Sequence, residues 1–130
     1  MTSPCYCLDT HSLIWYFTGS STLSPKAFET LEQIFSGEAV GIISVIVILE
    51  ALHVSYKHKG FVFPKFLEAL KIPTITICPL EKEVLMEGLM LPKKLNIHDR
   101  VVVATAIVND CPLITKDRII KSIREVESIW

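Results

Sequence analysis

Short runs that are apolar at every position alternate along this chain with segments that have helical spacing, and each run ends beside a residue that can cap a helix. Residues 4–8 end at Asp9, and residues 39–43 end at Ser44. Runs of this kind predict strands that are covered on both faces, as in the parallel sheets of α/β proteins. Ligands bind in such folds at the carboxyl ends of the strands, so we expect the functional residues there.

The same patterns predict the remaining elements. We expect five strands, at residues 4–8, 39–43, 73–78, 112–115 and 126–130. We expect helices at residues 11–17, 25–36, 45–56, 61–70, 80–91, 99–109 and 117–123. Strands that alternate with helices favour an α/β fold, here a three-layer α/β/α sandwich around a central, mainly parallel sheet of about five strands. No linker or repeat interrupts the pattern, so residues 1–130 are expected to form a single domain.

Composition excludes several classes of protein. No apolar run approaches the length of about 18 residues that a membrane span needs, and no signal peptide is evident, so we expect a soluble, cytoplasmic protein. A net charge of −1 excludes a globally basic nucleic-acid binder, so any such binding has to be local. The four cysteines are set in apolar context and do not pair at zinc-site spacing, so we interpret them as reduced core residues.

Four acidic residues occupy positions where a lone carboxylate would be costly. Asp9 and Asp117 follow predicted buried strands, Glu50 is the only charge in the apolar helix 45–56, and Asp99 begins another apolar helix. Each has a structural explanation of its own: a turn for Asp9, an ion pair for Glu50, and helix capping for Asp99 and Asp117. Taken together, clustered carboxylates repel one another unless a cation lies among them. Oxygen ligands of this kind suit Mg²⁺ or Mn²⁺.

Several segments, in this order along the chain, resemble the successive blocks of the PIN-domain family, in the subgroup typified by VapC-type toxins. They are LDTHSLIWYF, ISVIVILEALHV, HDRVVVATAIV, LITKD and the closing VESIW. The resemblance implies a metal-dependent ribonuclease on a parallel α/β/α fold, with Mg²⁺ or Mn²⁺ as cofactor. It also implies an RNA substrate, a homodimer and an inhibiting antitoxin as a partner.

Carried over by position, four residues match the acidic residues that hold the catalytic ion in the family: Asp9, Glu50, Asp99 and Asp117. Thr115 resembles the hydroxyl residue that orients the first aspartate or the waters of the metal. Many relatives have a further acid three residues before the equivalent of Asp99, and this chain has Asn96 there.

Basic residues near the predicted crevice are candidate RNA contacts, chiefly Arg100, Lys116 and Arg118, although a solvated surface role is the alternative for each. His98 is interpreted as a loop or capping residue. The aromatic residues from Trp15 to Phe17 are interpreted as core or dimer interface rather than as a platform for stacking bases.

Other functions for a strand that ends in aspartate fit less well. A dehalogenase-like phosphatase needs a second aspartate at the position that His11 occupies, and a receiver domain needs paired acids near its start. A PIN-like fold retained as a non-catalytic RNA-binding or interaction module stays open as the second hypothesis.

Overall fold

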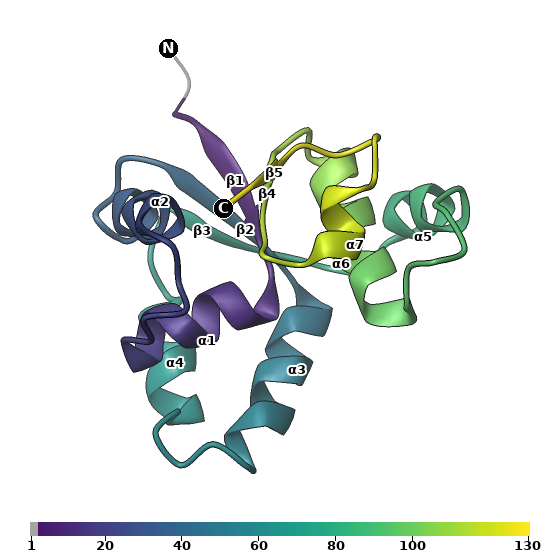
Figure 1. Ribbon diagram of the computed structural model, residues 1–130. Coiled ribbons are helices and arrows are strands. Elements are labelled where there is room, and N and C mark those ends of the chain that lie inside the picture. Colours follow the sequence, from purple (N-terminus) through teal and green to yellow (C-terminus); the bar gives the residue numbers. More distant parts are fainter. Residues whose placement is uncertain (1–2) are drawn as a thin grey trace.

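The computed structural model describes residues 3–130, and within them five strands form one sheet in the order β3-β2-β1-β4-β5. Every neighbouring pair is parallel. The strands are β1 (Cys5–Leu8), β2 (Val40–Ser44), β3 (Ile75–Cys78), β4 (Leu113–Ile114) and β5 (Ser128–Ile129). Helices flank the sheet, so the predicted parallel α/β sheet of about five strands is confirmed (Figure 1).

Five of the seven helices in the described residues begin at a residue whose side chain caps the first turn. The helices are α1 (Thr10–Thr18), α2 (Pro25–Phe35), α3 (Val45–Ser55), α4 (Phe63–Ala69), α5 (Lys82–Leu89), α6 (Ile97–Val108) and α7 (Arg118–Lys121). Side-chain oxygens of Asp9, Ser24 and Ser44 accept backbone N–H groups of the first turns of α1, α2 and α3. Helices α1, α3 and α4 gather where β1 and β2 end, at the bottom of Figure 1, and α5 and α6 lie to the right.

The core consists of the inward-facing residues of the strands and of the helix faces that cover them. Cys7 and Leu8 of β1, Ile43 of β2, and Leu113 and Ile114 of β4 have no exposed surface. Helix α6 contributes a further buried run from Val102 to Ala106. These central strands are therefore covered on both faces, as their apolar sequences predict.

Two apolar segments at the margin of the sheet are only partly buried. Helix α3 is apolar almost throughout, yet only Val47 and Ala51 are buried, and Leu49 is 61% exposed. Strand β3 is an edge strand, and Ile77 on it is 41% exposed. An apolar run alone does not distinguish a face that packs against the core from a face that remains open.

The prediction that all four cysteines are reduced is wrong. Cys5 at the start of β1 and Cys111 just before β4 form a disulfide, with Cα atoms 5.5 Å apart. Strands β1 and β4 are neighbours, which brings together two cysteines separated by 106 positions in sequence. Cys7 is buried as a free thiol and Cys78 is a half-buried free thiol.

Candidate active site

Strand order brings the predicted acidic residues to one edge of the sheet. Strand β1 lies between β2 and β4, with Leu8 level with Ile114. Asp9 follows β1 directly, and Thr115 follows β4 directly. Glu50 lies on α3, the helix that follows β2. Parallel strands end at the same edge, so residues far apart in sequence meet at the carboxyl ends of these three strands.

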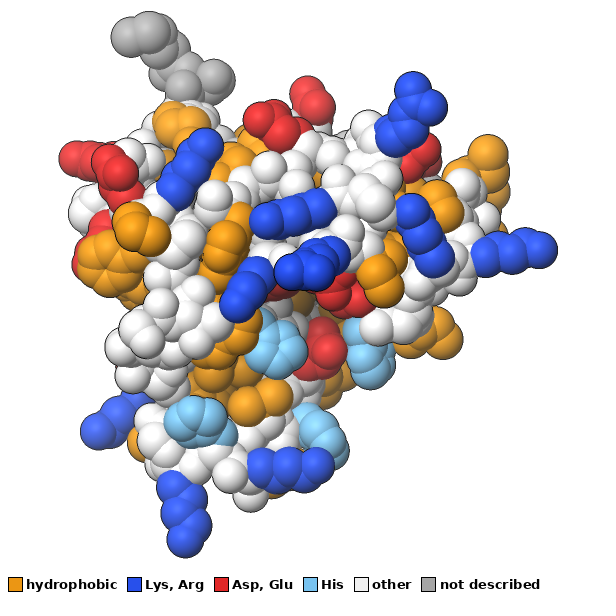
Figure 2. Space-filling model, viewed as in Figure 1, with side chains coloured by type: hydrophobic (Ala, Val, Ile, Leu, Met, Phe, Trp, Pro, Cys, Tyr) orange, Lys and Arg blue, Asp and Glu red, His pale blue; other side chains and the backbone are white. Residues whose placement is uncertain are grey.

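A pocket of about 450 Å³ opens at this edge. It is lined by the four predicted acids and six other residues: Asp9, Glu50, Asp99 and Asp117, with Thr10, His11, Trp15, Asn96, Val102 and Lys116. Figure 2 shows carboxylate and histidine side chains near the centre of this face, below a group of lysine and arginine side chains. All four acids of the predicted metal site therefore share one pocket.

Asp9 is held in place by the start of the helix that follows it. Its Oδ1 accepts the backbone N–H of Ser12 at 2.9 Å. Burial raises the pKa of the Asp9 carboxyl, and hydrogen bonds from Ser12 and Thr115 oppose that rise by stabilising the charged form. Thr115, which is fully buried, also accepts the backbone N–H of Asp117 through its hydroxyl oxygen at 3.1 Å. Thr115 therefore contacts two of the acids, and its orienting role stays a prediction.

Asp117 has a second structural function at the start of α7. Its Oδ1 accepts the backbone N–H of Ile120 at 2.9 Å, so the predicted capping explanation holds for this residue. A capping carboxylate keeps one oxygen free, so a structural and a functional role are compatible here.

Asp99 is not the cap of its helix. Helix α6 begins two residues earlier than predicted, and Asn96 is its cap, with Oδ1 accepting the backbone N–H of Asp99 at 2.8 Å. Desolvation raises the pKa of the Asp99 carboxyl first, followed by the negative charges of Asp117, Glu50 and Asp9, while His98 lowers it. Asp99 therefore interacts electrostatically with each of the other three acids.

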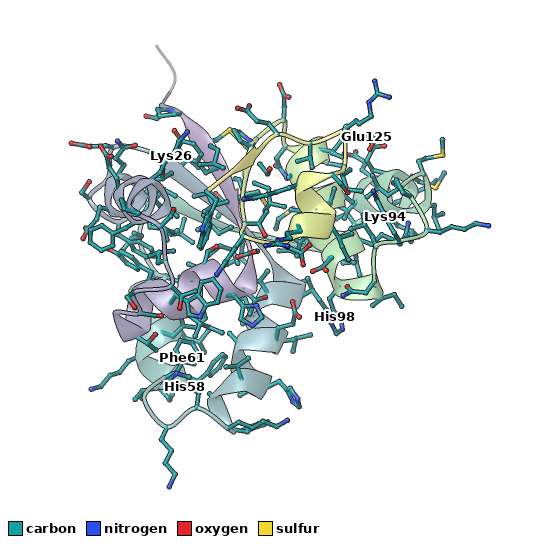
Figure 3. The ribbon with its side chains drawn as sticks, viewed as in Figure 1. Lys26, His58, Phe61, Lys94, His98 and Glu125 are labelled. Atoms are coloured by element: carbon teal, nitrogen blue, oxygen red, sulfur yellow. A yellow bond between two sulfur atoms is a disulfide. The ribbon has the colours of Figure 1, made fainter. Side chains whose placement is uncertain are left out.

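Glu50 has two polar contacts, a hydrogen bond and a histidine nitrogen, that the sequence did not single out for this purpose. The buried hydroxyl of Thr10 donates to Glu50 Oε1 at 2.8 Å. His98 Nδ1 lies 3.3 Å from Glu50 Oε2, and Figure 3 shows His98 at the start of α6, beside α3. His98 was interpreted as a loop or capping residue, and this interpretation is wrong because it faces the carboxylate instead. The only signal in the sequence was its position next to Asp99.

The acids do not form a ready-made metal cage. Among residues 3–130, no three His, Cys, Asp or Glu side chains are placed so that they could hold one ion directly. Mg²⁺ usually keeps several waters and contacts one or two carboxylates, with substrate phosphates completing its shell. An open pocket lined by oxygen donors suits an ion that binds in this way. A closed site made only of protein ligands would leave no room for its waters.

The predicted basic contacts divide into two groups. Arg100 donates four hydrogen bonds from its guanidinium to the carbonyl oxygens of Gly88, Leu91, Pro92 and Leu95, at 2.9–3.1 Å. Its donors are committed to the α5–α6 connection, so the structure does not support Arg100 as an RNA contact. Lys116 and Arg118 are exposed, and Lys116 lines the pocket itself.

A family model for the PIN domain matches residues 6–126, which is nearly the whole chain and includes all four acids. The chain belongs to the PIN-domain family. The predicted α/β fold class and the resemblance to the PIN-domain family are therefore confirmed. No curated protein matches the sequence significantly.

Solved structures share the fold of this PIN domain at low sequence identity. A chain in the crystal structure of VapBC2 from Rickettsia felis bound to a DNA fragment from their promoter has a TM-score of 0.71 and 17% identity, covering 96% of this chain and 97% of that chain. A chain in a toxin-antitoxin complex from Klebsiella pneumoniae has a TM-score of 0.71 and 24% identity, with 93% and 94% covered. A chain of DNA-bound VapBC from Salmonella typhimurium has a TM-score of 0.70 and 15% identity, with 97% of each covered.

Within the described residues, no helix of this PIN domain combines the length and the apolar character that a membrane crossing requires.

Proposed function

We propose that this PIN domain is a metal-dependent endoribonuclease that hydrolyses phosphodiester bonds in RNA. One observation above all supports the proposal: four carboxylates, from four segments between residues 9 and 117, line one pocket at the carboxyl edge of the sheet. Such a cluster is unfavourable without a cation, and after burial the neighbouring carboxylates contribute to the raised pKa of Asp99. The cost of bringing the carboxylates together points to a function that requires them.

In the proposed site, Asp9, Glu50, Asp99 and Asp117 would hold Mg²⁺ or Mn²⁺, some of them through waters that the ion keeps. When bound, such an ion would activate water and offset the negative charge of the phosphodiester. Ser12 and Thr115 orient Asp9. Thr10 and His98 orient Glu50. Lys116 and Arg118 would hold the phosphates of the RNA on either side of the cleaved bond.

The test is cleavage of a mixed RNA pool with Mg²⁺ or Mn²⁺, comparing wild type with Asp99→Asn. Glu125→Gln is the matched control, since Glu125 is exposed and lies away from the pocket (Figure 3). We expect Asp99→Asn to lose at least about 100-fold of the cleavage rate, whereas Glu125→Gln cleaves like wild type. Equal cleavage by wild type, Asp99→Asn and Asp9→Asn would exclude this site as the source of activity.

A non-catalytic RNA-binding or interaction module is the second candidate function. It is favoured by one observation, that no three potential ligands in the described residues are already placed around a common point. Calorimetric titration with Mn²⁺ distinguishes the two. The nuclease requires binding that Asp9→Asn weakens, whereas the module would bind RNA equally well after the metal is chelated.

We further propose that the chain is the toxin of a type II toxin-antitoxin pair and forms a homodimer. The fold likeness to chains of VapBC and toxin-antitoxin complexes supports the first part. The second part is supported by exposed apolar side chains on α3 and α5, such as Leu49 and Leu89, since such surfaces are often covered by a second protein chain. Light scattering of the purified chain tests the dimer. Co-purification with the product of a small adjacent reading frame, together with loss of cleavage, tests the antitoxin.

A further inference from the structure

One part of the pocket wall is not explained by metal binding. Trp15 and His11 lie on α1 beside the acids, with ring centroids 5.5 Å apart, and both line the pocket. Trp15 packs edge-on against Trp130 of the C-terminus, with centroids 5.8 Å apart. Trp130 and the core therefore fix the position of the indole, while part of its surface remains on the pocket side.

A cation covers the Trp15 ring. The Lys116 ammonium lies 5.9 Å from the ring centroid, and the Lys116 side chain is exposed. The face of the ring below this exposed side chain is therefore turned towards the pocket and not towards the core. Trp15 was interpreted from the sequence as core or dimer interface rather than as a platform for stacking bases, and its place in the pocket wall favours the stacking role instead.

We propose that Trp15 is the floor of a subsite for one unpaired nucleobase of the RNA, next to the cleaved phosphodiester. This rests on the proposed function, since it places a substrate group in the same pocket. His11 forms the side wall of the subsite, and the ammonium of Lys116 moves from the ring to a neighbouring phosphate when the base enters. The substrate class is therefore RNA that is single-stranded at the cleavage point.

The balance of interactions favours this exchange. An exposed cation over an aromatic ring changes an equilibrium by about 2- to 5-fold. A base stacked on an aromatic side chain changes affinity by about 5- to 150-fold. The displaced ammonium also gains a contact with a phosphate. The cation–ring contact that is lost is therefore weaker than the interactions that replace it. The pocket volume of about 450 Å³ lies within the range of small-ligand sites.

Trp15 fluorescence provides a direct test. The chain has two tryptophans, so Trp130→Phe leaves Trp15 as the only reporter. Adding Asp99→Asn to this variant suppresses cleavage, so that binding of a short oligoadenylate can be followed with Mg²⁺ present. We expect quenching as the base stacks. We expect little quenching with an otherwise identical RNA that lacks bases, or with double-stranded RNA.

Affinity measurements complete the test. In the Asp99→Asn background, Trp15→Leu is expected to weaken oligoadenylate binding by about 5- to 100-fold, whereas Trp15→Phe retains binding to within about 3-fold. Lys116→Gln is expected to lower the slope of log affinity against log salt concentration by about one, because one phosphate contact is lost. Circular dichroism of each variant separates a loss of the subsite from a loss of folding, and Trp15→Phe preserves the packing against Trp130.

The outcomes separate this proposal from the proposed function. If wild type cleaves RNA but Trp15→Leu binds oligoadenylate as tightly as its parent, without quenching in the reporter, the subsite is wrong and the nuclease stands. If Trp15 is quenched by oligoadenylate but wild type does not cleave RNA, the subsite stands and the nuclease is wrong. Absence of any binding to oligoadenylate overturns the subsite outright.

Discussion

At the scale of single residues, Asn96 determines what Asp99 can do. Because Asn96 caps α6, the Asp99 carboxyl is not needed at the helix start and faces the pocket with the other acids. Burial and the three neighbouring carboxylates raise its pKa. The folded protein therefore binds a proton at Asp99 more tightly than the unfolded chain does, and in the absence of metal the charged form reduces stability.

We predict that Asp99→Asn stabilises the metal-free protein at neutral pH. A gain of roughly 1 kcal/mol would appear as an increase of about 3–5 °C in Tm. The difference between variant and wild type should shrink as the pH falls from neutral towards 3.8, because the wild-type carboxyl becomes protonated through its raised pKa. Thermal unfolding across this pH range, with chelator present, provides the measurement. A lower Tm for Asp99→Asn at neutral pH would contradict the prediction.

Thr10 supports Glu50 through its hydroxyl, and the contact can be removed with little change in shape. Thr10→Val is expected to weaken Mn²⁺ binding by about 10- to 100-fold, since orienting partners of metal ligands typically contribute this much. Thr18→Val is the matched control, because the Thr18 hydroxyl, on the same helix, bonds the Ile14 carbonyl instead. Calorimetric titration compares the two. Equal Mn²⁺ affinity for both variants would show that Thr10 does not position Glu50.

At the scale of secondary-structure elements, Arg100 joins α6 to the connection that follows α5. It lies in the first turn of α6, and its four carbonyl acceptors belong to residues 88–95. Charged hydrogen bonds of this kind contribute about 1.5–3 kcal/mol.

We predict that Arg100→Met lowers the free energy of unfolding by about 2–4 kcal/mol, because several of these carbonyls lose their partner at once. Arg118→Met, at an exposed position of α7, should change stability by less than about 0.5 kcal/mol. Urea unfolding of both variants is the measurement. A similar small effect for both would mean that water replaces the guanidinium without cost.

The Cys5–Cys111 disulfide ties β1 to the segment before β4, at the ends of these strands opposite to the pocket. A disulfide that closes a loop of 106 positions stabilises a protein by up to about 4–5 kcal/mol, because it restricts the unfolded chain. We expect reduction, or the variant with Cys5→Ser and Cys111→Ser, to lower Tm while leaving the cleavage rate at 25 °C unchanged. Cys78→Ser, a free half-buried cysteine, is the control.

The sequence was informative where local rules decide the structure. Apolar runs with capping residues located β1, β2 and β4, and hence Asp9, Glu50 and Asp117 at one edge. It was not informative where the partner is distant or formed by backbone. The disulfide depends on strand order, and the role of Arg100 depends on carbonyls that a turn presents. Helix α3 shows the same limit, because its apolar sequence suits both a core face and an exposed face.

At the scale of the whole molecule, the proposed metal ligands come from four segments that span residues 9–117. An ion that contacts several of them stabilises the folded chain as a whole, since the unfolded chain offers no such site. We predict that Mg²⁺ or Mn²⁺ raises the free energy of unfolding by about 2.7 kcal/mol when its concentration is 100 times Kd. Differential scanning calorimetry over a metal series tests this, and Asp9→Asn combined with Asp99→Asn should abolish the dependence.

The hydrogen bonds that orient the carboxylates also restrict how each one can coordinate. One oxygen of Asp9 is occupied by the Ser12 N–H, and one oxygen of Asp117 by the Ile120 N–H. Each of these oxygens keeps a second lone pair, but the N–H fixes the plane in which the carboxylate can bind an ion. Ca²⁺ takes six to eight oxygens, often from bidentate carboxylates, whereas Mg²⁺ accepts an octahedral shell completed by water. Carboxylates fixed in this way would suit a small ion that keeps its waters better than a larger ion that draws on several bidentate carboxylates.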